Sequence, residues 1–350
     1  MGFRPGSVRQ ASANDRHLMK VLVTGATGFI GGNLARELWR RGYQVRALVR
    51  PGSNTLTIED TGIEQVAGDV LDAASVRRAI TRCQAAFHCA AAYTFWARDV
   101  RVIYRTNVDG TRIVLEEARR CGVEKVVYTS TVSTVGLLPG GLGSEDIPAD
   151  SNHLVGHYKK SKYQAEQLAL RMAAEGLPVV VVNPTAPVGP WDVKPTPTGR
   201  VVLDFLRGKI PAYVNTGMNL VDVADVAAGH ILAMERGVPG QRYLLGNRNL
   251  SLQQVFQLLA ELTGRPAPRL RLPFWVAIGA GYVDQAWEGG LLRREPRIPV
   301  EGLRLSRTPM YVSCQKAVSE LELPQSPVEG ALEQAVRWFT DYGYVGNIGR

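Results

Sequence analysis

Residues 20–31 read KVLVTGATGFIG, and this stretch decides the fold class. The apolar, β-branched run Lys20–Thr24 predicts a strand, and the amphipathic period of Phe29–Arg41 predicts a helix that closes at Gly42. A glycine-rich loop joins the two. The order strand, loop, helix is the first half of a βαβ unit, from which parallel sheets are built.

The glycines of this loop predict a site for the phosphates of a dinucleotide. Gly25 permits a tight turn, Gly28 lets backbone amides approach a pyrophosphate, and Gly31 permits close packing of the helix. The helix N-terminus then offers unpaired N–H groups and a positive dipole. A purely structural glycine turn is the alternative. The cofactor contacts expected here are Gly25, Thr27, Gly28, Phe29, Ile30 and Gly31.

The same alternation of strand and helix continues to about Pro184. It predicts a Rossmann-type, doubly wound parallel α/β sheet, in which the valine run at residues 179–182 is a strand buried on both faces. The further strands expected are Gln44–Val49, Ile63–Ala67, Ala85–Cys89 and Glu124–Thr131, and the further helices are Asn107–Cys121 and Tyr158–Glu175.

The order loosens after Pro184 and predicts a smaller C-terminal substrate-binding lobe. We expect a flexible tail at residues 1–18, a dinucleotide-binding domain at 19–185 and mainly substrate lobe at 186–350, with about 219–247 returning to the first domain. The elements expected in this half are helices at Asn219–Arg236, Ser251–Gly264 and Pro327–Tyr342, and a short strand at Gln241–Leu245.

Composition narrows the class of protein. The net charge is +9, but the arginines are spread along the chain, so no nucleic-acid partner is expected. Four cysteines form no CxxC pair, which is typical of a reducing cytoplasm. The longest apolar run, Leu272 to Val283, is too short to span a membrane. We interpret it as a core or dimer-face helix, with a membrane-surface contact as the alternative.

The end of the second predicted strand bears on the choice of dinucleotide. An NAD site usually carries an acidic residue there, to bind the ribose 2′-OH. This chain has Val49 followed by Arg50, whose guanidinium could pair with a 2′-phosphate. NADP is therefore favoured and NAD stays possible, unless Arg50 is only an exposed loop charge. After the third strand, Asp69 and its neighbour Val70 are expected near the adenine, with a plain turn aspartate as the alternative.

Tyr158 and Lys162 are the candidate acid–base pair. Residues four apart share one face of a helix, and an ammonium beside a phenol lowers the phenol pKa toward the working range. Such a tyrosine can give a proton to a carbonyl or take one from an alcohol. The strand before it ends in hydroxyl residues that could hold the substrate oxygen, Thr131 first and Ser130 second, with strand-end capping as the alternative.

The end of the fourth predicted strand contains His88 followed by small residues. Ala90 and Ala91 leave room for a cofactor to cross the sheet edge, and His88 is interpreted as a structural histidine rather than an acid or base. Neither His157 nor Cys89 has a partner that indicates nucleophilic chemistry. No HExxH motif or cysteine cluster predicts a metal site.

Together these residues resemble the extended short-chain dehydrogenase/reductase family, also described as NAD-dependent epimerases and dehydratases. Within it the chain looks most like hopanoid-associated sugar epimerases and dihydroflavonol-4-reductase-like enzymes, on Met19–Arg50 and Asn183–Pro190. The resemblance covers about Met19 to Tyr344. The matching motifs are Gly25–Gly31, Gly68-Asp69, His88–Ala91, Asn107–Thr111, Thr129–Thr131, Tyr158–Lys162 and Asn183-Pro184.

The resemblance implies roles for individual residues. Tyr158 would be the acid/base, Lys162 would bind the nicotinamide ribose and tune Tyr158, and Thr131 would take the place usually held by serine. Asn107 and Pro184 would lie at the cofactor, Pro184 against its nicotinamide end. The candidate substrate contacts are Thr94, Trp96, Thr131, Arg200 and Tyr311.

Two departures from the family pattern bear on the reaction. Val132-Ser133 stands where the sugar 4,6-dehydratases of this family have an Asp-Glu pair, so dehydratase chemistry lacks its acid and base here. Asn183 stands where many relatives place an arginine, which argues against a nucleotide-sugar contact.

Three functions remain open from the sequence. The first is an NAD(P)-dependent oxidoreductase that reduces a ketone or oxidises a secondary alcohol. The second is a sugar or nucleotide-sugar epimerase, which the resemblance links to hopanoid biosynthesis. The third is a non-catalytic cofactor sensor, which would be expected to have lost Tyr158 or Lys162. The resemblance also implies a homodimer, formed through the helices Asn107–Cys121 and Tyr158–Glu175.

Overall fold

The computed structural model describes residues 19–137, 141–150, 154–292, 294, 296 and 299–346. The tail expected at residues 1–18 lies outside these described residues. The strands are β1 (Lys20–Thr24), β2 (Gln44–Val49), β3 (Glu64–Ala67), β4 (Ala85–His88), β5 (Lys125–Thr129), β6 (Val179–Pro184), β7 (Ala186–Val188), β8 (Ala212–Val214), β9 (Gly217–Asp222), β10 (Arg242–Leu245), β11 (Arg248–Ser251) and β12 (Leu270–Leu272).

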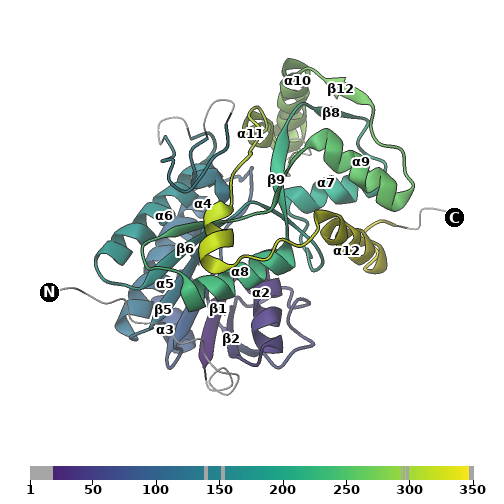
Figure 1. Cartoon of the computed structure of the whole chain (residues 1–350). Helices are drawn as coiled ribbons and strands as arrows, with labels where there is room; N and C mark the ends of the chain where they lie inside the picture. Colours follow the sequence, from purple (N-terminus) through teal and green to yellow (C-terminus); the bar gives the residue numbers. More distant parts are fainter. Residues whose placement is uncertain are drawn as a thin grey trace.

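The α-helices alternate with these strands through most of the chain (Figure 1). They are α2 (Phe29–Arg40), α3 (Ala73–Ile80), α4 (Arg101–Tyr104), α5 (Gly110–Arg120), α6 (His157–Ala174), α7 (Pro197–Leu206), α8 (Val223–Arg236), α9 (Leu252–Thr263), α10 (Phe274–Asp284), α11 (Val300–Leu305) and α12 (Val328–Asp341). Shorter 3-10 or π turns are η1 (Arg105–Asp109), η2 (Val132–Thr134), η4 (Gln285–Leu291) and η5 (Ala317–Leu321).

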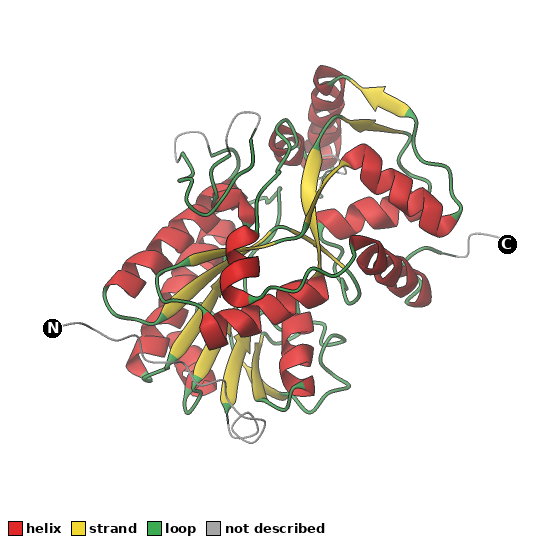
Figure 2. Ribbon diagram, viewed as in Figure 1, coloured by secondary structure: helices red, strands yellow, loops and turns green. Residues whose placement is uncertain are grey.

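Seven parallel strands form the main sheet in the order β10-β6-β5-β4-β1-β2-β3. Two apolar cores cover its two faces: α2 and α8 pack on one, and α3, α5 and α6 on the other. Figure 2 shows the helices on both sides of the yellow strands. The order of the first six strands is that of a Rossmann fold, so the predicted fold class is confirmed. All six residues of β6 are buried, as its valine run predicts.

The second lobe is built around the sheet β11-β9-β7, over which α7, α9 and α12 enclose a third core. The predicted helix at Asn219–Arg236 is wrong at its start. Residues 217–222 form β9, and α8 begins only at Val223, where the Asp222 carboxylate accepts a hydrogen bond from the Ala224 amide at 2.8 Å. Residues 219–222 therefore belong to the second lobe's sheet, while α8 and β10 complete the main one.

The apolar run Leu272–Val283 does form a helix, α10, but it is not a core helix. Within α10 only Ala277 and Gly281 are buried, and Trp275 is 74% exposed. The core interpretation is therefore wrong. In the described ranges, no helix has both the length and the apolar character needed to cross a membrane.

Candidate active site

The candidate site lies at the carboxyl ends of β1 and β4, where the strand order of the main sheet reverses direction. In open parallel sheets this edge is where ligands bind. The glycine loop after β1 and the loop after β4 meet here. A Cβ atom added to Gly25, whose φ is +76°, would lie 2.7 Å from the Ala90 amide nitrogen, so only glycine fits this approach.

Gly31 brings α2 against the same loop. A Cβ atom at Gly31 would lie 2.3 Å from the Gly25 carbonyl oxygen, closer than real Cβ contacts come. The Gly28 amide donates to that carbonyl at 2.9 Å and closes the turn. These two contacts fix where α2 begins relative to β1.

The N-terminus of α2 fits a dinucleotide phosphate. Its N-cap residue is Gly28, which supplies no side-chain cap, and the first turn carries no acidic residue. Unpaired N–H groups and the positive end of the helix dipole therefore meet no competing anion in that turn. Thr27 and Ile30 are half-buried beside this terminus, whereas Phe29 is buried in the protein.

The other expected cofactor residues are spread along the same edge of the sheet. Arg50 is exposed just beyond the end of β2. Asp69 follows β3, and its carboxylate accepts a hydrogen bond from the Leu71 amide at 2.9 Å, which is turn geometry; its contact with adenine stays a prediction. Val70 is buried against the core that includes α5. Ala91 is exposed and Ala90 half-buried, as a crossing cofactor requires.

Asn107 and Pro184 are both buried. The Asn107 side chain joins two parts of the protein: its oxygen accepts from the Ala92 amide at 2.7 Å, and its nitrogen donates to Ser161 Oγ at 2.9 Å. It thus ties the loop after β4 to α6, in addition to any role at the cofactor. Pro184 ends β6 and pairs in register with Leu245 of β10.

His88 is the last residue of β4 and is fully buried. Its Nδ1 lies 2.7 Å from Thr24 Oγ1 and its Nε2 lies 3.0 Å from Thr111 Oγ1, which itself donates to the Asn107 carbonyl. Burial, with a smaller contribution from the Lys162 charge, lowers the pKa of His88 to about 3. His88 is therefore neutral at pH 7, in keeping with the structural role predicted for it.

Buried neutral histidines predict a specific loss of stability in acid. His230 on α8 is also fully buried, and burial lowers its pKa to about 4. Between pH 6.5 and 4.5 the unfolded chain binds protons at both histidines and the folded chain does not. Each histidine should therefore lower the free energy of unfolding by about 1.4 kcal/mol for every unit by which the pH falls. Asp192, whose pKa burial raises to about 6, should offset part of this loss. Urea titrations across this range measure the net loss.

A variant separates the two contributions. His88→Asn should lower stability at pH 7 because it disturbs the bonds to Thr24 and Thr111. It should also make the pH dependence between 6.5 and 4.5 shallower by about 1.4 kcal/mol per pH unit, because one of the two buried histidines no longer titrates. Carboxylates whose pKa is lowered lose their stabilising effect at lower pH, below about 4.5. An unchanged slope in the variant would contradict the assignment.

Tyr158 lies in the first turn of α6 and is buried. Gly156 precedes the helix with φ +87° and has no side chain to cap it. The cap comes instead from Glu301 of α11, whose carboxylate accepts a hydrogen bond from the His157 amide at 3.3 Å. The helix terminus that positions Tyr158 is therefore held by a residue more than one hundred positions away in the chain.

The surroundings of Tyr158 combine one hydroxyl with an aromatic wall. The Thr131 side chain lies near enough to act on the phenol, which tends to lower the pKa of Tyr158. The ring of Tyr93 lies 4.7 Å and that of Phe95 6.1 Å from the Tyr158 ring, between centroids. Burial is the larger influence and raises the pKa of Tyr158, which corrects the expected lowering. The phenol thus holds its proton at neutral pH.

Lys162 is buried one turn further along α6. Its ammonium donates to Tyr128 Oη at 2.9 Å and to the Thr129 carbonyl at 2.7 Å, both at the end of β5. Burial lowers the pKa of Lys162 to about 8, and the carboxylate of Glu166 opposes this shift. At pH 7 the side chain remains mainly charged and is fixed beside the strand end that carries Thr131.

Behind Thr131 lies a buried polar cluster that the sequence did not predict. Asn183 Nδ2 donates to the Thr131 carbonyl at 3.1 Å and to Glu166 Oε2 at 2.7 Å, and Thr134 Oγ1 donates to the same carboxylate oxygen at 2.7 Å. Arg242 of β10 pairs with Glu166 at 3.2 Å. Ser130 lies within this group, with its Oγ 3.4 Å from Thr134 Oγ1.

The predicted substrate residues do not form one cluster around Tyr158. Thr94 and Trp96 share a turn in which Thr94 Oγ1 donates to the Trp96 carbonyl at 2.6 Å. Arg200 lies on α7, where its charge acts on Asp192, and Tyr311 packs on Gly217 of β9. The side chains in contact with Tyr158, namely Tyr93, Phe95 and Thr131, include two that were not predicted; their signal was the aromatic run at residues 93–96.

Asp192 is a second candidate that sequence reasoning missed. It is 1% exposed in the loop after β7, and burial raises its pKa to about 6. Its carboxylate accepts hydrogen bonds from Thr196, at 2.8 Å from both the amide and Oγ1. The same loop reaches α2: the Pro190 carbonyl accepts from Asn33 at 3.1 Å, and Arg36 lies over the Trp191 ring. The second lobe thus contacts the helix of the glycine loop.

Metal ligands do not gather in the described parts of the chain. No group of three or more His, Cys, Asp or Glu side chains there has the arrangement that a metal ion needs. The candidate site presents a phenol, a hydroxyl and an ammonium next to the glycine loop.

Comparison with known proteins supports the resemblance read from the sequence. The sequence model of the NAD dependent epimerase/dehydratase family matches residues 21–246. A Synechocystis sp. protein named "Putative dihydroflavonol 4-reductase" is 46% identical over 328 residues, covering 92% of this chain and 95% of its own length. Sterol demethylase protein B of Methylococcus capsulatus is 36% identical, covering 93% and 100%.

Solved structures show the same architecture. A nucleoside-diphosphate-sugar epimerase from Pseudomonas aeruginosa superposes with a TM-score of 0.78 at 26% identity, over 93% of this chain and 99% of that one. The similarity thus extends through the main sheet and the second lobe, and it includes proteins named as reductases and proteins named as epimerases.

Proposed function

The chain belongs to the NAD-dependent epimerase/dehydratase family and is an enzyme of the extended short-chain dehydrogenase/reductase type, and we propose a reaction for it on this basis. The proposed reaction is the reduction of a ketone or the oxidation of a secondary alcohol. The observation that carries the proposal is the setting of Tyr158: a protonated phenol beside the Thr131 side chain and walled by Tyr93 and Phe95. An aromatic wall suits an apolar carbonyl compound better than a polar sugar.

The proposed chemistry divides the work between cofactor and protein. A bound nicotinamide dinucleotide supplies or accepts the hydride. The Tyr158 hydroxyl gives its proton to the substrate carbonyl oxygen, and the Thr131 hydroxyl holds the same oxygen in place. The buried ammonium of Lys162, fixed by Tyr128 and Thr129, stabilises the phenolate that remains. In the reverse direction Tyr158 takes the proton of the alcohol.

The buried cluster behind Thr131 also favours a reductase over an enzyme of nucleotide-sugars. Asn183 stands at the position where a nucleotide-sugar contact would be expected, but its side chain is fully buried and donates inward to Thr131, Thr134 and Glu166. The amide nitrogen of Asn183 therefore holds the strand end in position.

For the cofactor we propose NADP rather than NAD, because an exposed arginine follows β2 where an acidic residue would bind the ribose 2′-OH. The proposal also includes a homodimer formed through the helices at residues 107–121 and 158–175.

The cofactor preference can be tested at Arg50. Arg50→Ala should weaken NADPH binding about tenfold or more, because a charge-assisted hydrogen bond to the 2′-phosphate is lost, and should leave NADH binding unchanged. Isothermal titration calorimetry with both dinucleotides measures the two affinities. Arg78→Ala, at another exposed arginine on α3, is the matched control. Equal weakening of both dinucleotides would remove Arg50 from the proposed 2′-phosphate site.

The reaction itself is tested by net turnover of the cofactor. The purified full chain is mixed with NADPH and a panel of aromatic and alicyclic ketones, flavanonols and nucleotide-sugar ketones, and the absorbance of the reduced nicotinamide is followed. Steady oxidation of NADPH is expected with an apolar ketone. Turnover confined to sugar nucleotides, or none with any ketone, would count against the proposal.

An epimerase is the second candidate, because a nucleoside-diphosphate-sugar epimerase is among the similar structures. An epimerase returns its hydride to the substrate, so it consumes no cofactor overall. Inversion of a sugar carbon, observed by NMR without net NADPH oxidation and with cofactor bound to the purified protein, would replace the first proposal with this one.

A further inference from the structure

The segment α10–η4 presents a continuous apolar surface. The two elements form one helical stretch from Phe274 to Leu291. Trp275, Val283, Trp287 and Leu291 are 74, 72, 60 and 67% exposed. Their spacing of eight, four and four residues places them on one side of the helix. We call residues 274–291 the apolar helix.

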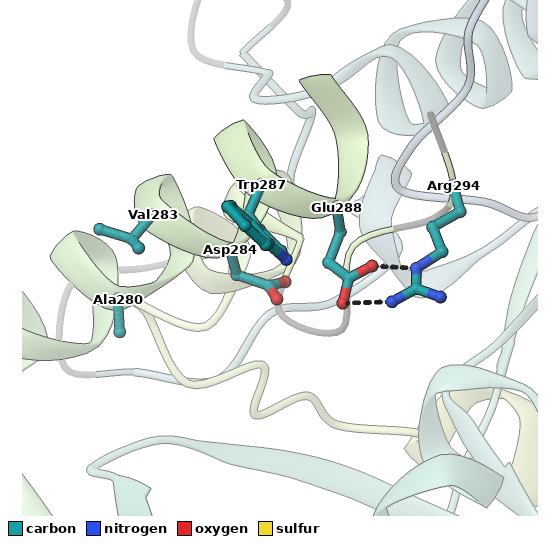
Figure 3. Close-up of a pocket in the computed structure, with 6 residues that line it drawn as sticks. All are labelled: Ala280, Val283, Asp284, Trp287, Glu288 and Arg294. Atoms are coloured by element: carbon teal, nitrogen blue, oxygen red, sulfur yellow. Dashed lines mark hydrogen bonds and ion pairs between the residues drawn. The ribbon is translucent and has the colours of Figure 1, made fainter. Parts of the chain in front are cut away.

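Polar side chains are kept off the exposed side of the apolar helix. Each exposed residue of this stretch is apolar, a tyrosine or a glycine. Its two acidic residues do not share that exposure: Asp284 is half-buried, and Glu288 is buried and paired with Arg294. Figure 3 shows the Glu288–Arg294 pair, with Ala280, Val283 and Trp287 on the same helical segment. Such segregation of apolar from charged residues is typical of a surface that leaves water.

The sequence around the apolar helix is rich in positive charge. Residues 265–307 contain eight arginines and four acidic residues, so this short segment carries +4 of the chain's net charge of +9. Arg271 and Arg307 line a groove of about 670 Å³ together with Phe274, Trp275 and Ile278. At the other end of α10, Arg304 donates to the Tyr282 hydroxyl. The partner that fits is apolar in its interior and anionic at its surface.

From these features we infer that the apolar helix docks the protein on an anionic lipid surface, with its tryptophans inserted at the level of the headgroups and its arginines against the phosphates. Tryptophan and tyrosine prefer this interface because their rings are apolar and their N–H or O–H groups are polar. A second copy of the chain fits less well. A two-fold contact would set the arginines of one copy against those of the other.

The docking surface adjoins the wall of the active site. The backbone of Gly289 packs on Trp96, and Gly302 of α11 packs on Phe95, which contacts Tyr158. In a step that rests on the proposed function, docking would bring the aromatic wall beside Tyr158 close to the lipid phase. The substrate class is then a membrane-dissolved amphiphile with a carbonyl or secondary alcohol.

Vesicle co-sedimentation of the full chain tests the docking without any catalytic assay. The probes are vesicles of equal parts phosphatidylglycerol and phosphatidylcholine, and vesicles of phosphatidylcholine alone. We expect binding to the anionic vesicles to be stronger by about tenfold or more and to weaken as salt is raised. Equal sedimentation with both, or none with either, would overturn the inference.

Two pairs of variants locate the binding surface. The double variant Trp275→Ser/Trp287→Ser should lower the partition coefficient from water to anionic vesicles about tenfold or more. Trp39→Ser, at an exposed tryptophan on α2, should not lower it. The double variant Arg271→Glu/Arg307→Glu should remove the preference for anionic vesicles. Arg78→Glu, on α3, should keep that preference. Unchanged binding in the tryptophan pair would overturn the inference, provided circular dichroism shows a native fold.

Two further measurements separate this inference from its rivals. If analytical ultracentrifugation shows a dimer that the tryptophan pair converts to a monomer, and vesicles are not bound, the surface is an interface between copies and the inference fails. Turnover of a water-soluble ketone in the absence of vesicles should be the same in the tryptophan pair as in the original chain. If no ketone is reduced but the protein still binds anionic vesicles, the proposed function is wrong and the docking inference stands.

Discussion

Tyr158→Phe is expected to lower kcat for ketone reduction about a thousandfold, because no other group takes over the proton that Tyr158 gives to the carbonyl oxygen. The phenylalanine ring keeps the packing against Tyr93 and Phe95, so the fold and the affinity for NADPH should be unchanged. The measurement is NADPH oxidation with the best ketone of the panel, together with calorimetry of cofactor binding.

Two variants for comparison come from the same helix and from the strand end beside it. Tyr163→Phe removes a hydroxyl from α6 five residues further on and should leave kcat within about twofold. Thr131→Val should lower kcat less than Tyr158→Phe does, because it removes a hydroxyl that orients the substrate and keeps the proton donor. A Tyr158→Phe variant that retains a tenth of the activity would show that another group supplies the proton.

Gly31→Ala is expected to weaken dinucleotide binding about a hundredfold and to destabilise the protein by roughly 1–3 kcal/mol. The new methyl group would lie 2.3 Å from the Gly25 carbonyl oxygen, so the start of α2 must move away from the glycine loop. This movement displaces the amides that would meet the phosphates. Calorimetry with NADPH and urea unfolding measure the two effects.

The matched control is Gly330→Ala. Gly330 is also a helical glycine, but a Cβ atom there would have no neighbour within 4 Å. Since alanine favours the helix over glycine, this variant should be slightly more stable and should bind the dinucleotide normally. If Gly31→Ala also binds normally, the loop does not hold the phosphates in the way proposed.

The architecture could be predicted because its signals are local. The strand–glycine–helix order and the buried valine run fix a parallel sheet without any long-range information. The errors lie where local patterns compete. The stretch Gly217–Asp222 continues the apolar period of α8, and only the N-cap at Asp222 marks the boundary. The helix expected from Asn107 begins earlier, at Arg101, and includes a π turn at Arg105–Asp109.

The candidate site was predicted in part for the same reason. The spacing of Tyr158 and Lys162 is local, but the partners that surround them are not: Tyr128 and Thr129 come from β5, and Glu301 comes from α11. The pKa of Tyr158 was expected to be lowered by the ammonium four residues away. Burial of the phenol, which the spacing of residues does not reveal, acts in the opposite direction.

The position of β10 at the edge of the main sheet also has a consequence for biosynthesis. This strand covers the outer side of β6, yet it is translated only after all of β7, α7, β8, β9 and α8. Until residue 245 has left the ribosome, the four valines of β6 form an open strand edge, which is the kind of surface that pairs with other chains. The nascent chain therefore passes through a stage in which this edge is unpaired, and a protein truncated between residues 185 and 241 would remain in that stage.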